Sequence, residues 1–98
     1  MTIKKTRDGD SLTLELQGRL DVNSAPELKE LLDSELSGVT ALVFDLKELE
    51  FISSAGIRVI TAAQKQMNKQ GSMKIKNVNS IITEIFKLTG LINVFDIE

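Results

Sequence analysis

Two adjacent serines, Ser53 and Ser54, are the residues of this sequence whose type and position best suit chemistry. They follow an apolar run that predicts a buried strand over residues 41–46, and a segment with helical periodicity comes after them. The serines therefore lie where a helix leaves its first backbone N–H groups unpaired. Ser54 is the better candidate of the two, and if it is the N-cap, Ala55 and Gly56 occupy the first turn of the helix. A hydroxyl in that position either caps the helix or carries an anion.

Both interpretations of Ser54 have a physical basis. Serine is a favoured N-cap residue, so a plain cap is the simpler one. A phosphate on Ser54 would add about −1.5 to −2 charges at pH 7 beside the positive end of the helix. It would be tolerated there, and it would change the surface that a docking partner meets. Gly56 has no side chain, so we expect it to leave the serine open to approach.

Asp21 follows the second predicted strand, and Asp45 lies near the end of the predicted strand 41–46. Ligands of open α/β sheets gather beyond the carboxyl ends of the parallel strands, so we expect both to lie near Ser53 and Ser54. The simpler interpretation makes Asp21 a turn or cap residue, and Asp45 an acceptor for loop amides.

Composition narrows the classes of function. A chain of 98 residues predicts a single domain, residues 1–98, and a net charge of −2 gives no reason to expect nucleic acid as a partner. No apolar run is long enough to insert into a membrane, and no apolar segment follows the basic N-terminus as in a secretory signal. Histidine and cysteine are absent, which removes the commonest general base, thiolate chemistry and the usual metal ligands. We expect no enzyme, no metal site and no cofactor.

The predicted element order is ββαβαβαβ. An Asp8-Gly9-Asp10 turn predicts an antiparallel hairpin of strands 2–7 and 12–17. Ser24 and Glu27 have capping-box spacing at the start of a first helix that stops at Gly38. The remaining predicted elements are strand 41–46, a helix from Ser54 to Gly71, strand 73–76, a helix from Asn79 or Ser80 to Gly90, and strand 92–97. This alternation predicts an α/β fold with a mainly parallel sheet, an antiparallel edge hairpin and helices packed against it.

Several segments resemble the STAS domain, the sulfate transporter and anti-sigma factor antagonist family. They are Gly18-Arg19-Leu20-Asp21, Ser24-Ala25-Pro26-Glu27-Leu28, Val43-Phe44-Asp45-Leu46 and Phe51-Ile52-Ser53-Ser54-Ala55-Gly56-Ile57-Arg58. The resemblance covers nearly the whole chain in the family's order. It departs from the best-studied antagonists at Ser53, where they have an aspartate, and at Arg58, where they have a small residue. Because the sequence stops at Glu98, we expect the family's C-terminal helix to be short or absent.

The resemblance implies a switchable binding module in the bacterial cytoplasm. Stand-alone members bind an anti-sigma factor that is also a serine kinase, which regulates transcription indirectly. The kinase phosphorylates the serine that corresponds to Ser54, with Ser53 as the fallback acceptor, and a PP2C-type phosphatase restores binding. Asp21 matches an acidic residue close to the acceptor. The implied docking surface is loop 47–52 with the second helix, and the partner-binding residues are Asp21, Ser53, Ser54, Gly56, Ile57, Arg58 and Thr61.

Three other functions are compatible with parts of this sequence. A serine hydrolase lacks both a histidine and a Gly-x-Ser-x-Gly elbow. A response-regulator receiver would use Asp45 but needs an acidic cluster at the end of its first strand, where Thr6-Arg7 stands. The same fold could also be a soluble STAS subunit of a lipid-transport ABC complex or of a stressosome-type assembly, and the sequence leaves this alternative open.

Overall fold

The computed structural model describes residues 1–98 and opens with the predicted hairpin. β1 (Thr2–Asp8) pairs antiparallel with β2 (Ser11–Leu20) around a tight turn at Gly9, whose φ of 60° is one that glycine adopts without strain. The alternation of β2 buries Leu12, Leu14 and Leu16 on one face of the sheet.

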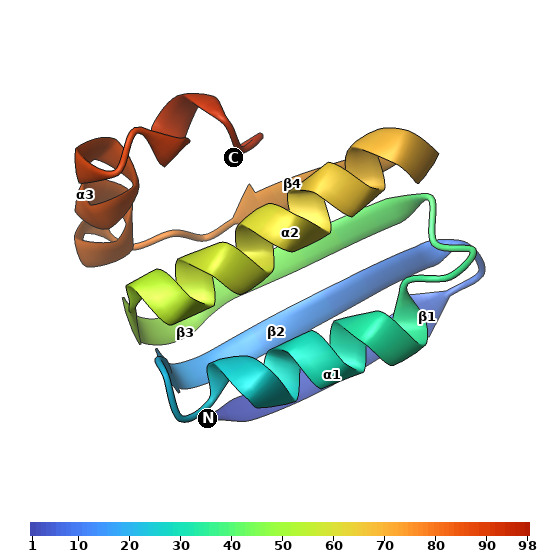
Figure 1. The fold of residues 1–98 in the computed structure, drawn as a ribbon, viewed down its shortest axis with the longest axis horizontal. Coiled ribbons are helices and arrows are strands. Elements are labelled where there is room, and N and C mark those ends of the chain that lie inside the picture. The colour runs from blue at the N-terminus through green and yellow to red at the C-terminus, as the bar shows by residue number, and fades with distance from the viewer.

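A four-stranded sheet in the order β1-β2-β3-β4 forms the body of the fold (Figure 1). β3 (Ala41–Ile52) lies parallel to β2 on one side and to β4 (Ser72–Lys76) on the other. The sheet is therefore mixed, with three parallel strands and one antiparallel edge strand. The predicted α/β fold class is confirmed.

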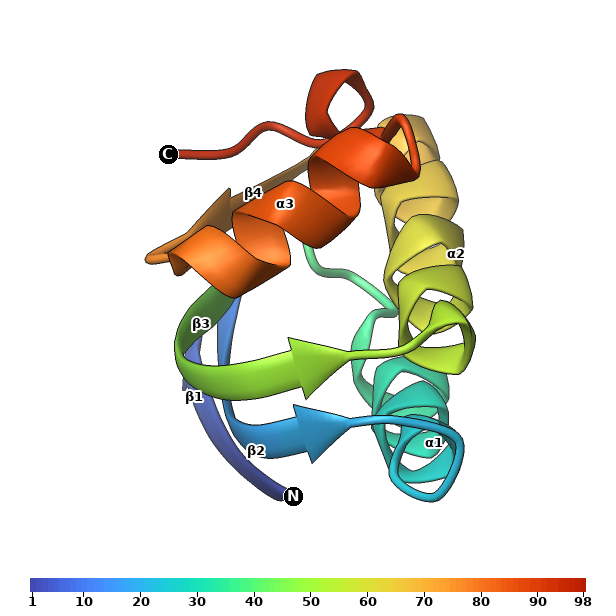
Figure 2. The same cartoon turned by 90° about the vertical axis from the view of Figure 1, so that its left-hand side faces the viewer.

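Three helices cover this sheet. α1 (Ala25–Glu35) and α2 (Ser54–Gln70) lie side by side against one face, and α3 (Ser80–Leu88) lies beyond the carboxyl end of β4 (Figures 1 and 2). The apolar sides of all three helices join the strands in one core of 22 buried residues. The β2–α1 and β3–α2 connections therefore lie on the same side of the sheet, beyond the carboxyl ends of β2 and β3, and the candidate site lies there.

β3 is twice as long as the sequence predicted. The segment 47–52, expected to be a loop, continues the strand alongside residues 17–20 of β2. The expectation was wrong because β3 contains two irregularities, where it uses one more residue than β2 between consecutive pairs. These bulges shift the apolar alternation, so that Leu49 and Ile52 are both buried although they are three residues apart.

The expected last strand, residues 92–97, is also wrong. A 3₁₀ turn, η1 (Leu91–Asn93), follows α3, and only Ile97 forms an isolated bridge to Ile75 of β4. The chain coils here because Phe95 is buried against Phe86 of α3, edge-on with ring centroids 5.4 Å apart.

The helix ends agree with the sequence in part. Asn79 caps α3 by accepting a hydrogen bond from the Ile82 N–H at 2.8 Å, and Gly71 is the C-cap of α2. The capping box expected of Ser24 and Glu27 does not form, since the Ser24 side chain makes no cap hydrogen bond.

Candidate functional site

The candidate site lies where β2 and β3 end in register and lead into α1 and α2. We call the two connections the β2–α1 junction (residues 19–25) and the β3–α2 junction (residues 51–57). Leu20 pairs with Ile52 as both strands end, and the Ser53 N–H donates to the Leu20 carbonyl at 2.8 Å. This pairing brings Asp21 to the same edge of the sheet as Ser53 and Ser54, as predicted.

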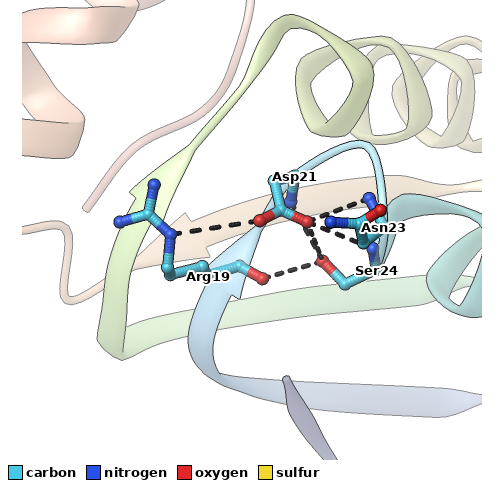
Figure 3. A network of polar contacts seen from close by, with 4 residues as sticks. All are labelled: Arg19, Asp21, Asn23 and Ser24. Atoms are coloured by element: carbon cyan, nitrogen blue, oxygen red, sulfur yellow. Dashed lines mark hydrogen bonds and ion pairs between the residues drawn. The ribbon is translucent and has the colours of Figure 1, made fainter.

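The β2–α1 junction is held by its own polar side chains (Figure 3). The Ser24 hydroxyl accepts from the Asp21 N–H at 2.9 Å and donates to the Arg19 carbonyl at 2.7 Å. The Asp21 carboxylate accepts from the backbone N–H groups of Asn23 at 3.0 Å and Ser24 at 3.3 Å. The turn therefore uses the side chain of Ser24 to close on the strand that precedes it, and not to cap α1.

These backbone donors favour the ionised form of Asp21. The hydrogen bond from the Asn23 N–H lowers the pKa of the Asp21 carboxyl most, the Ser24 backbone and hydroxyl lower it further, and the Arg19 guanidinium adds a small contribution. Partial burial of the carboxyl opposes them without reversing the direction. The junction thus presents a fixed negative charge at this edge at neutral pH.

Arg19 connects the two junctions. Its guanidinium lies 4.5 Å from the centre of the Phe51 ring, in the geometry of a cation–π contact, and its Nε is 3.9 Å from a carboxylate oxygen of Asp21. Neither Arg19 nor Phe51 was predicted as a site residue from the sequence. A parallel register would have found them, because these two residues pair across β2 and β3.

The β3–α2 junction leaves its serine hydroxyls without such partners. Ser53, not Ser54, is the N-cap residue of α2, and its carbonyl accepts from the Ile57 N–H at 2.9 Å. The Ser53 hydroxyl makes no cap hydrogen bond, is buried and has no partner. Ser54 is the first helical residue and is exposed. The cap of α2 therefore lies one position before Ser54.

Gly56 has a different role from the expected one. It is buried and faces inward, and a Cβ there would lie 2.6 Å from Cγ of Leu20 and 3.0 Å from Cγ1 of Ile52. Glycine is needed because α2 begins directly against the ends of β2 and β3. Gly56 therefore cannot be a surface contact for a partner, and what it provides is the close approach of the helix.

Asp45 does not join the site. It lies mid-strand in β3, seven residues before Ile52, because β3 runs on past its predicted end. Its carboxylate accepts from the Lys47 N–H at 3.1 Å and from the side-chain amide of Asn77 at 3.0 Å. The interpretation of Asp45 as an acceptor for nearby amides is the one that agrees with these contacts.

Beyond the junction, α2 presents the remaining predicted contact residues. Arg58 is exposed, whereas Ile57 and Thr61 are half-buried. The structure has no group of three or more acidic, cysteine or histidine side chains that could hold a metal ion. None of the helices combines the length and the apolar character that a membrane crossing requires.

Comparison with known proteins agrees with this geometry. A STAS domain family model matches residues 2–98. An anti-sigma-B factor antagonist of Bacillus subtilis is 32% identical over 90 residues, which cover 91% of this chain and 83% of the relative. An anti-sigma factor antagonist from Mycobacterium paratuberculosis has a similar fold, with a TM-score of 0.88 and 23% identity over 98% of this chain and 83% of the other. The Bacillus cell fate determinant SpoIIAA in its phosphorylated form aligns with a TM-score of 0.78 and 15% identity over 99% of this chain and 91% of the other. The chain belongs to the STAS domain family.

Proposed function

We propose that this protein is a bacterial anti-sigma factor antagonist that binds a serine-kinase anti-sigma factor and loses that binding when Ser54 is phosphorylated. The protein itself is not a catalyst. A PP2C-type phosphatase removes the phosphate and restores binding in the cytoplasm. The relative from Bacillus subtilis, named an anti-sigma-B factor antagonist, supports the partner class. SpoIIAA, which shares the fold, has a phosphorylated form.

The observation that carries this proposal is the contrast between the two serines. Ser54 is exposed at the first position of α2, whereas the Ser53 hydroxyl is buried. A kinase must bring the γ-phosphate of ATP in line with the acceptor hydroxyl, so access decides between neighbouring serines. Access favours Ser54, and the fallback acceptor Ser53 would require the start of α2 to open.

A phosphate on Ser54 is compatible with the folded protein but not with the docked complex. The first N–H groups of α2 have no acceptor within the helix, and the positive end of the helix dipole favours an anion there. The same charge placed in a docked interface has to be desolvated, and it repels any carboxylate of the partner. The folded state therefore tolerates the modification while the complex does not.

The test is to incubate the protein with its cognate anti-sigma factor kinase and ATP and to map the phosphate by mass spectrometry. We expect label on Ser54 in the wild type and in Ser53→Ala, and none in Ser54→Ala. Label that persists in Ser54→Ala and disappears in Ser53→Ala would refute the assignment. Calorimetry should show Ser54→Asp binding the kinase at least about tenfold more weakly, which corresponds to about 1.4 kcal/mol. Binding as tight as that of the wild type would contradict the electrostatic account.

A further inference from the structure

One side of α2 carries three positive side chains aligned with Ser54, and two of them, Lys65 and Lys69, lie outside the site described above. Ser54, Arg58, Lys65 and Lys69 are separated by four, seven and four residues, which places them on one side of a helix with 3.6 residues per turn. All four are exposed. At 1.5 Å per residue the row is about 22 Å long. We call these four residues the α2 charge row.

The cations of this row are unpaired. The five ion pairs of the structure include none of Arg58, Lys65 and Lys69, and α2 contains no carboxylate over its 17 residues. The helix dipole stabilises Lys69, which lies in the last turn. It gives no reason for an arginine one turn from the N-terminus. The row as a whole is therefore not explained by the stability of α2.

The neighbouring helix has the opposite charge. Glu27 and Glu30 of α1 are exposed and also take part in no ion pair. A uniformly negative surface, such as a nucleic acid or an anionic membrane, would meet these carboxylates together with the α2 charge row. A protein can place its own carboxylates against α2 alone. This complementarity favours a protein surface as the occupant.

We propose that the α2 charge row docks a carboxylate-rich surface of the partner protein. A phosphate on Ser54 weakens this docking because it pairs with Arg58 and lowers the positive charge of the row. The inference rests on the proposed function and specifies the chemistry of its partner. The second helix is already part of the docking surface that the resemblance implies, and the inference adds which of its side chains bind and what chemistry they meet.

The pairing of a phosphate on Ser54 with Arg58 follows from the spacing of these two residues. Residues i and i+4 are neighbours on a helix surface, so a phosphate on Ser54 lies within reach of the Arg58 guanidinium. Phosphate and guanidinium form strong charge-assisted hydrogen bonds. The modification therefore adds about two negative charges and also occupies the first cation of the row, which lowers the charge of the row from three positive to about one.

Phosphorus NMR tests the pairing without any partner. Phosphoserine is introduced co-translationally at position 54, and its second ionisation, ordinarily near pH 6, is titrated. Arg58→Gln should raise this phosphate pKa by about 0.3 units, and Arg58→Lys should restore most of the difference. Ser80 provides a matched control, since it is the exposed first residue of α3 and the residue four positions on is Glu84. Arg58→Gln should leave the pKa of a phosphate on Ser80 unchanged. An unchanged pKa at position 54 would overturn the pairing.

Binding to the purified cognate anti-sigma factor kinase tests the docking surface. We expect Lys65→Gln/Lys69→Gln to weaken binding about tenfold in low salt, and the difference to shrink in high salt. Lys87→Gln is the control, because Lys87 is exposed in the last turn of α3 and unpaired. It should bind like the wild type.

The outcomes separate this inference from the proposed function. If the double variant binds like the wild type while Ser54→Asp does not bind, the α2 charge row is not a docking surface and the proposed function stands. If the unmodified wild type does not bind any anti-sigma factor kinase, both are overturned. Binding to phosphatidylserine vesicles that the double variant loses would assign the row to a membrane surface instead.

Discussion

The two junctions at this edge of the sheet have the same topology and opposite chemistry. Each follows a parallel strand, contains a serine and begins a helix on the same face. In the β2–α1 junction the Ser24 hydroxyl and the Asp21 carboxylate bond the backbone of their own turn. In the β3–α2 junction the Ser53 hydroxyl is buried without a partner and Ser54 is exposed.

This difference indicates which serine is available for chemistry. A hydroxyl that already donates and accepts within a turn must give up those bonds before it can react or bind. Ser24 is in that position, being only 9% exposed. Ser54 gives up nothing, because no cap bond or turn bond depends on its side chain. The β2–α1 junction thus fixes the shape of the edge, and the β3–α2 junction carries the residue that can change its charge.

The largest expected effect comes from removing a hydroxyl at each junction. Ser24→Ala should lower the free energy of unfolding by about 1–3 kcal/mol, because the Asp21 N–H and the Arg19 carbonyl lose their side-chain partner. Ser53→Ala should leave the free energy unchanged or raise it by up to about 1 kcal/mol, since a buried unpaired hydroxyl is removed. Urea denaturation of the two variants measures the contrast.

Ser54→Ala is the control for this pair, and it should lie within about 0.5 kcal/mol of the wild type, as exposed positions usually do. A loss of about 0.5–2 kcal/mol in Ser53→Ala would show that Ser53 acts as an ordinary N-cap. In that case the two junctions would not differ in the way described.

The same residues show where the sequence was informative. The hairpin turn at Gly9, the cap at Asn79 and the alternation of β2 are local signals, and the structure confirms each of them. The continuation of β3 depends on bulges set by pairing with β2, which no window of β3 alone contains. The final segment 92–97 is rich in apolar residues like a strand, yet burial of Phe95 against Phe86 decides its shape.

The candidate site divides in the same way. The proximity of Asp21 to the two serines follows from topology, because parallel strands end at a common edge. The roles of Ser53, Ser54 and Gly56 depend on the direction in which each side chain points, and a shift of one residue in the start of α2 changes all three. A sequence pattern places a helix start only to within one or two residues.

The next effect in size concerns the charge of Asp21. Its pKa is lower in the folded protein than in the unfolded chain, where an aspartate titrates near 3.9, so its contribution to stability is present above about pH 5. That contribution is lost as the pH falls through the folded-state pKa. Urea denaturation should show the wild type more stable than Asp21→Asn at pH 7, with a difference that shrinks below about pH 4. A difference that stays constant down to pH 3 would contradict this account.

The smallest expected effect tests whether the two junctions are independent. Arg19 of one stacks on Phe51 of the other, and an exposed cation–π contact contributes about 0.5–1 kcal/mol. A double-mutant cycle with Arg19→Gln and Phe51→Leu should give a coupling of this size, measured in 1 M salt to screen the Arg19–Asp21 pair. Zero coupling would mean that only the backbone bond from Ser53 to Leu20 and the packing around Gly56 connect the junctions. A measurable coupling would instead mean that Arg19 of the β2–α1 junction also orients Phe51, which lies two residues before Ser53. A change at Arg19 would then be transmitted to the surface on which a partner docks.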